Sequence, residues 1–96
     1  PGKVEKLNVP SGPGVRFDSF LYQGYSVVPH YDAMLAKVIV YDLDRPRAIK
    51  RLLRALDELE IEGVPTNLEE QKMLLKSKEF QRGNFGTSLY SRLILS

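Results

Sequence analysis

The sequence contains no cysteine and only one histidine, His30. Without cysteine there are no disulfides, no thiolate nucleophiles and no cysteine-based zinc sites, which fits a reducing compartment. No Ser-His-Asp triad can be drawn around His30 beyond coincidence, and one imidazole with no carboxylate pair nearby is a poor metal site. The sequence therefore indicates no metal site and no redox chemistry, and we interpret His30 as structural.

Long apolar runs are also missing. No segment approaches the roughly 18 apolar residues of a membrane span. The N-terminal stretch PGKVEKLNVP has no apolar core of the signal-peptide type. We therefore expect a cytoplasmic protein with no membrane partner. The chain starts at Pro1 without a methionine, which suggests a piece of a longer protein.

Neither sign of charge dominates the composition. Lys and Arg number 14 against 12 Asp and Glu, a net charge of +2 over 96 residues. This near balance gives only weak attraction to nucleic acid, so we expect no nucleic-acid partner. With 43% hydrophobic residues the chain is typical of one globular domain over residues 1–96.

The first half of the sequence is rich in strand-forming residues. Residues 3–9, 15–22 and 25–28 predict strands, with the turn sequence PSGPG after the first. Gln23-Gly24 between the second and third segments predicts a hairpin. The run 34–41 is apolar except for Lys37, which predicts a strand covered on both faces.

The period changes from Arg45 onward. Apolar residues recur every three or four positions and predict a helix over 45–60, with Asp44 as its cap and Pro46 in its first turn. After Gly63 and Pro65, a second helix is predicted.

In that second helix, Thr66 and Glu69 predict a capping box, and Met73, Leu74 and Leu75 its buried side. A short helical piece over 78–81 and an amphipathic stretch from near Thr87 follow. The prediction is one α+β module, with strands first and two or three helices after them.

Lys37 is the most unusual charge, because a lysine in an apolar strand is costly unless it is paired. It is either a catalytic or substrate-binding amine or a partner in a salt bridge to Asp32 or another carboxylate. No nucleophile or phosphate loop accompanies it, so the salt bridge is favoured. The aspartates are scattered over turns and strand ends, and no catalytic pair can be assigned.

The first helix carries a basic stripe, for which a solvated face is the default interpretation: Arg47, Lys50, Arg51 and Arg54. These cations lie in its first turns, with acidic residues in the last, which is the reverse of what the macrodipole favours. We hypothesise that some of these arginines meet carboxylates outside the helix.

An ordered set of motifs runs through nearly the whole chain. GVRFDS at 14–19, Gly24-Tyr25 and YDAMLAK at 31–37 come first. The pattern R..AI.RL..AL.E..I.GV.TN follows over 45–67, and then Phe80, Gly83 and Thr87. With this joint spacing, the sequence resembles the C-terminal domain of biotin carboxylase, the ATP-dependent ligase component of acetyl-CoA, propionyl-CoA and pyruvate carboxylases.

The resemblance implies a small antiparallel β barrel-sandwich, a rudimentary single hybrid motif, with helices. It implies a parent enzyme that uses ATP, Mg²⁺ and bicarbonate to carboxylate biotin on a carrier protein, for example in the acetyl-CoA carboxylase of fatty acid biosynthesis. In the family, N-terminal and central ATP-grasp domains hold the catalytic residues. The present chain would therefore be non-catalytic and would bind no cofactor by itself.

The resemblance also implies roles for three residues. Arg16 and Asp32 match the subunit interface of homodimeric members. The segment after Gly86-Thr87 approaches the adenine of ATP in the family, which makes Leu89 a possible adenine contact. The alternative for Leu89 is a plain core residue of the last helix.

A second function remains open from the residues themselves. A stand-alone interaction module would bind an acidic partner or nucleic acid through the basic face from Arg47 to Arg54.

Overall fold

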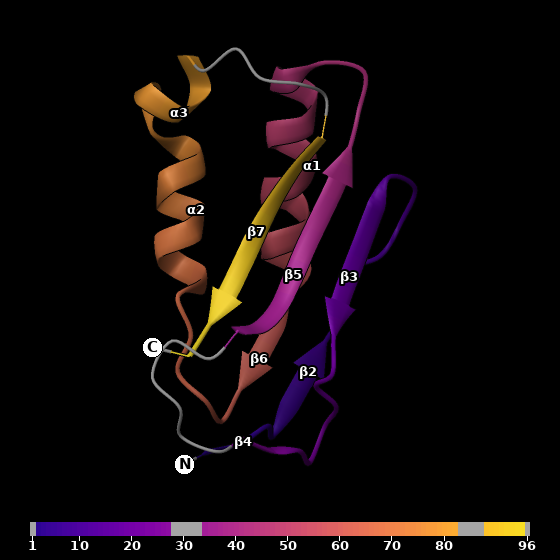
Figure 1. Cartoon of the computed structure of the whole chain (residues 1–96), viewed down its shortest axis with the longest axis vertical. Helices are drawn as coiled ribbons and strands as arrows, with labels where there is room; N and C mark the ends of the chain where they lie inside the picture. The colour runs from indigo at the N-terminus through magenta and orange to yellow at the C-terminus, as the bar shows by residue number, and fades with distance from the viewer. Residues whose placement is uncertain (1, 28–33, 83–87, 96) are drawn as a thin grey trace.

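The computed structural model describes residues 2–27, 34–82 and 88–95. Its centre is a three-stranded antiparallel sheet in the order β3-β5-β7, formed by Val15–Ser19, Met34–Tyr41 and Ser88–Ile94 (Figure 1). Two small antiparallel pairs lie below it: β1 (Gly2–Lys3) with β4 (Ser26–Val27), and β2 (Lys6–Asn8) with β6 (Glu60–Glu62). The predicted α+β class with antiparallel sheets is confirmed.

The predicted hairpin over 15–28 is wrong. A turn does form, since the Tyr25 N–H donates to the Tyr22 carbonyl at 3.0 Å and Gly24 has a φ of +96°. However, the arms of this turn do not pair with each other. The Val4 N–H donates to the Tyr25 carbonyl, and the Gly24 N–H donates to the Val4 carbonyl. The N-terminal segment therefore takes the hydrogen bonds that a hairpin would have used, and the predicted strand over 3–9 is split into β1 and β2.

Helix α1 (Arg45–Glu58) forms as its period predicts. The Asp44 side chain accepts a hydrogen bond from the Arg47 N–H at 2.9 Å, and Pro46 lies in the first turn, where no intrahelical donor is lost. The helix ends two residues before the predicted end at 60. The Glu60–Glu62 segment instead forms β6. This strand was not predicted, because the helical spacing of apolar residues runs up to it.

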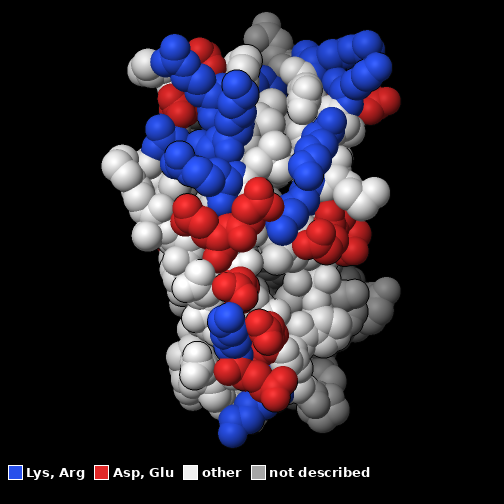
Figure 2. Space-filling view, turned by 180° about the vertical axis from the view of Figure 1, so that it is seen from behind, with Lys and Arg blue, Asp and Glu red and all other residues white. Residues whose placement is uncertain are grey.

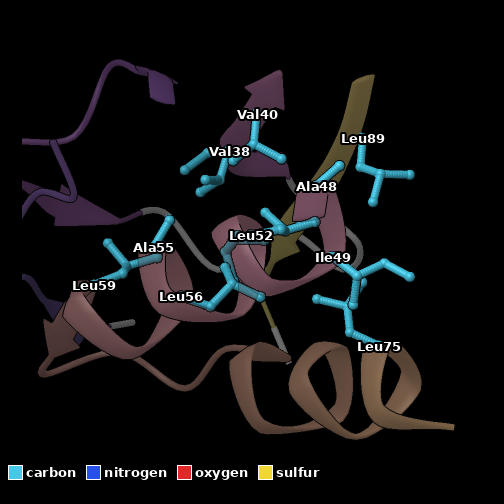
Figure 3. Packing of buried hydrophobic residues seen from close by; sticks show 12 residues of the cluster. Val38, Val40, Ala48, Ile49, Leu52, Ala55, Leu56, Leu59, Leu75 and Leu89 are labelled. Carbon is cyan, nitrogen blue, oxygen red and sulfur yellow. The ribbon is translucent and has the colours of Figure 1, made fainter. Parts of the chain in front are cut away.

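The main core lies between α1 and one face of the sheet. In Figure 3, Val38 and Val40 of β5 and Leu89 of β7 face the apolar side of α1, where Leu52 and Leu56 are fully buried. The prediction that both faces of residues 34–41 are covered is wrong. Successive strand side chains point to opposite faces. Lys37, Ile39 and Tyr41 lie half-buried or exposed on the face away from α1.

Helices α2 (Leu68–Lys76) and α3 (Lys78–Arg82) follow at the side of the sheet (Figure 1). The predicted Thr66–Glu69 capping box is wrong, because Asn67 is the N-cap residue and makes no side-chain capping bond. Its side chain instead holds β7: Nδ2 donates to the Arg92 carbonyl at 3.0 Å, and Oδ1 accepts from the Ile94 N–H at 2.8 Å. Of the three predicted buried residues of this helix, only Leu75 is buried.

The C-terminal stretch is a strand, so the prediction of strands first and helices after is wrong. In β7 the buried residues are Leu89, Ser91 and Leu93, which alternate with exposed neighbours. The buried Ser91 hydroxyl is 2.6 Å from Oε1 of Gln71 in α2. This contact satisfies a polar group within an otherwise apolar face and ties α2 to the sheet edge.

A second, smaller core lies under β1, β4 and the loop after β6. Its buried members are Val4, Leu21, Val27, Leu35 and Val64. Leu7 and Ile61, directly opposite each other in the β2–β6 pair, pack against both cores. This pair therefore joins the two cores into one folding unit.

Candidate functional site

Leu89, the predicted ligand contact, lies near the start of β7. It is 9% exposed and belongs to the main core. It also lines a surface hollow of about 430 Å³ between the β7 edge and helices α2 and α3. The other lining residues are Arg45, Gln71, Phe80, Ser88, Tyr90 and Arg92. Leu89 is thus a core residue with one side at a hollow, although in a strand rather than the predicted helix.

Arg45 forms the inner wall of this hollow. Its side chain is only 7% exposed, and one guanidinium nitrogen, Nη2, donates to the Phe80 carbonyl at 2.7 Å. The guanidinium also lies 4.6 Å from the centroid of the Phe80 ring. This contact joins the first turn of α1 to α3. Nothing in the sequence marks Arg45 as a buried cation, because it lies in the first turn of an amphipathic helix.

The hollow combines flat or apolar side chains with charged groups. Leu89, Phe80 and Tyr90 offer apolar surface, while Arg45 and Arg92 are cations. Such a mixture suits a planar ring that carries an anionic group. Among the described residues, no group of three or more His, Asp or Glu side chains is placed to hold a metal ion.

Arg16 lies on the exposed face of the sheet, where its partner is Asp18. Arg16 Nη2 is 2.8 Å from Asp18 Oδ2, and Nε is 3.1 Å from Oδ1, so both carboxylate oxygens are engaged. The hydrogen bonds from Arg16 hold the pKa of Asp18 below its usual value, and the charge of Lys37 adds to this effect. In return, Asp18 raises the pKa of Arg16.

Lys37 lies opposite Asp18 in the β3–β5 register, and its ammonium is 4.4 Å from the centroid of the Tyr90 ring. The pairing predicted with Asp32 lies outside the described residues. No other carboxylate in residues 2–27, 34–82 and 88–95 is within ion-pair distance of Lys37, so the contact found there is with an aromatic face. Because this face of the sheet is open, the long side chain reaches solvent and the burial cost that motivated the prediction does not arise.

The basic stripe of α1 faces away from the sheet. Figure 2 shows basic side chains gathered on the upper part of this side of the molecule, above a band of acidic ones. Arg51 Nε donates to Asp42 Oδ2 at 2.9 Å, and Arg47 Nε lies 3.6 Å from Asp44 Oδ2. The hypothesis that arginines of this stripe meet carboxylates outside the helix is confirmed.

Some residues singled out from the sequence lie outside the described residues. They are His30, Asp32 and the Gly86-Thr87 pair. In the described ranges, no helix is long and apolar enough to cross a membrane.

Comparison with known proteins gives one consistent family. The family model described as "Biotin carboxylase C-terminal domain" matches residues 1–92. The biotin carboxylase of Haemophilus influenzae is 47% identical over 90 residues, which cover 94% of this chain and 20% of that protein. The biotin carboxylase of Pseudomonas aeruginosa is 49% identical over 83 residues, 86% of this chain and 18% of that protein.

Solved structures agree with the sequence relatives. A crystal structure of a biotin carboxylase–β,γ-ATP complex from Campylobacter jejuni superimposes with a TM-score of 0.82 at 39% identity. The match covers 91% of this chain and 20% of that one. The chain therefore spans about a fifth of the length of these relatives. Because the family model matches nearly the full length of this chain, the chain belongs to the biotin carboxylase family, as the C-terminal domain.

Proposed function

We propose that this chain works as the C-terminal domain of an ATP-dependent biotin carboxylase, a ligase that carboxylates biotin on a carrier protein with bicarbonate. The observation that carries this proposal is the family match over residues 1–92. ATP and Mg²⁺ would be held mainly by N-terminal and central ATP-grasp domains. This chain would supply scaffold and interface rather than catalytic residues, in a cytoplasmic enzyme.

Complementation tests the proposal. A biotin carboxylase truncated before its equivalent of Pro1 is mixed with this chain, free biotin, bicarbonate and Mg-ATP. We expect bicarbonate-dependent ADP release only on mixing. Two pieces that fail to bind each other would contradict the proposal. The rival function, a stand-alone module for acidic partners or nucleic acid, has no support in the comparisons.

Within this function, we propose that Leu89 contacts the adenine of ATP. Its place at the hollow supports the proposal, because Leu89 and Phe80 provide the apolar surface that a purine face needs. The Campylobacter relative was crystallised as a β,γ-ATP complex. The small exposed fraction of Leu89 means that only one side of its side chain is available.

A matched pair of variants in the intact enzyme separates the adenine contact from the core role. Leu93 is buried on the same face of β7 but does not line the hollow. Leu89→Ala and Leu93→Ala should both lower stability, whereas only Leu89→Ala should raise the KM for ATP, by about tenfold. Equal KM values in the two variants would contradict the contact.

We also propose that the open face of the sheet forms part of a homodimer interface in the parent enzyme, with Arg16 and Asp32 as members. Tyr41 and Tyr90 are at least half exposed on this face, and Arg16 is fixed by Asp18. Exposed aromatic and arginine side chains are typical of interface centres. Arg16→Ala should raise the dissociation constant of the dimer in sedimentation experiments, while Lys78→Ala on α3 should not.

The finer fold description remains a proposal as well. The described strands form three separate small sheets. A barrel-sandwich of the rudimentary single hybrid type would need further pairing between them. An experimental structure of the intact enzyme, with its carrier protein, would test this arrangement.

A further inference from the structure

The basic stripe of α1 borders two hollows that no step of the proposed function uses. The first, about 300 Å³, is lined by Asp42 and by the four stripe cations Arg47, Lys50, Arg51 and Arg54. The second, about 370 Å³, is lined by Pro46, Ile49, Lys50, Leu53 and Gln81. Lys50 lines both, so a charged hollow and a largely apolar one adjoin along the same helix.

The charged hollow has more cations than its carboxylates neutralise. Asp42 pairs with Arg51, and Asp44 caps the helix and lies near Arg47. Within the described part of the chain, neither Lys50 nor Arg54 is within ion-pair distance of a carboxylate. Four cations against two carboxylates leave a formal charge of +2. Lys50 lies in the N-terminal half of α1 and Arg54 in its C-terminal half, so the excess charge is spread along the helix.

One cation of the stripe is fixed in place. Arg51 donates from Nε to Asp42 and from Nη1 to the Pro13 carbonyl. Gly14, with a φ of +73°, lets the guanidinium approach, because a Cβ there would lie 2.5 Å from Arg51 Nη1. Two of the five N–H groups of a guanidinium are used in these bonds. A positioned guanidinium loses little freedom on binding an anion, which favours binding over a merely solvated charge.

We infer that the stripe binds a small organic phosphate that carries an apolar substituent. A phosphate dianion has three acceptor oxygens and matches the excess of two positive charges. Its substituent would pass Lys50 into the hollow formed by Pro46, Ile49 and Leu53. The two hollows have the volume of a small-molecule site. This inference is independent of the proposed function.

The test uses n-hexyl phosphate as the probe and inorganic phosphate as its head group alone. Binding to the 96-residue chain is measured by calorimetry at low salt and pH about 8, where a phosphate monoester is a dianion. We expect hexyl phosphate to bind about tenfold more tightly than inorganic phosphate, because its chain buries apolar surface. Leu53→Ser should reduce this advantage, and added salt should weaken both.

A matched pair of double variants controls for general charge. Lys50→Ala with Arg54→Ala should weaken hexyl phosphate binding about tenfold. Lys76→Ala with Lys78→Ala removes two exposed cations from α2 and α3 and should leave it unchanged. Far-UV circular dichroism checks that each variant is folded.

Three results would overturn the inference. They are equal losses in the two double variants, equal affinity for hexyl phosphate and inorganic phosphate, or tighter binding of a glutamate-rich peptide than of hexyl phosphate. The last result would assign the stripe to an acidic polypeptide.

Discussion

At the residue scale, Gly63 is the glycine with least room for a side chain among those that the structure describes. Its φ is +100°, and a Cβ would collide with the Lys3 carbonyl oxygen and lie 2.9 Å from the Glu5 nitrogen. Gly24 has a similar φ of +96° but nothing within 4 Å. Gly24→Ala should therefore cost about 1 kcal/mol, from backbone strain alone. Gly63→Ala should cost roughly 3 kcal/mol or prevent folding.

Urea denaturation followed by circular dichroism compares the two glycine variants. Because their backbone strain is matched, the difference between them isolates the collision with the backbone of residues 3–5. Equal losses of stability would show that this segment moves aside easily.

Asp42 should make stability depend on pH. The N–H of Leu43 and then Arg51 hold its pKa below the usual value. The unfolded chain therefore binds the proton more readily, and acid favours unfolding. The stabilisation is complete above the unfolded pKa of about 4 and is lost as pH falls through the lower folded pKa.

The Asp42→Asn variant tests this dependence. The usual pKa of an aspartate is about 4, so the range from about pH 5 to about pH 3 is the informative one. Over this range, the free energy of unfolding of the variant should fall less steeply than that of the parent chain. Thermal unfolding at several pH values measures both slopes. Parallel curves would mean that Asp42 contributes nothing to the acid response.

At the scale of elements, α1 carries the core. Its residue Leu52 is fully buried against the sheet, whereas the next residue, Leu53, is half-buried. Leu52→Ala should cost about 3 kcal/mol in free energy of unfolding, since it leaves a cavity. Leu53→Ala should cost about 1 kcal/mol, because solvent reaches the site. Chemical denaturation measures both, and a larger loss for Leu53 would contradict the packing described here.

The elements differ in how far the sequence predicts them. Helix α1 was predicted because its period, its cap at Asp44 and its proline all indicate the same structure. Strand β7 was not predicted as a strand, because Leu89 and Leu93 are four residues apart, a spacing that fits a helix turn as well as an even strand period. The residue at the buried position between them is the polar Ser91, so apolar and polar residues do not alternate along this strand.

The site is less predictable than the elements. The hollow at Leu89 gathers residues 45, 71, 80 and 88–92, which only tertiary packing brings together. No local pattern in one sequence carries that information. Only the family resemblance indicated Leu89; Arg45 and Phe80 belong to the same set of motifs, but the resemblance implied no role for them.

At the scale of the whole molecule, two cores share the Leu7–Ile61 pair. Ile61→Ala should uncouple them and increase amide exchange in the smaller core. The Val4 amide, bonded to the Tyr25 carbonyl at 2.8 Å, should exchange about tenfold faster. The Val38 amide in the main sheet should change less.

Hydrogen exchange by NMR measures both amides. Leu53→Ala is the control, since among the described residues Leu53 packs against the main core and not against the smaller one. If Val4 and Val38 respond alike to Ile61→Ala, the two cores open as a single unit.

The last strand of the chain, β7, has a consequence for synthesis. It supplies Leu89 and Leu93 to the main core and pairs with the central strand β5. On the ribosome, β5 and α1 emerge well before their final partner. The part of their apolar surface that Leu89 and Leu93 cover stays exposed until residues near 94 leave the exit tunnel. A pause in translation before that point would expose those faces to chaperones, so the timing of elongation becomes part of how this domain reaches its native state.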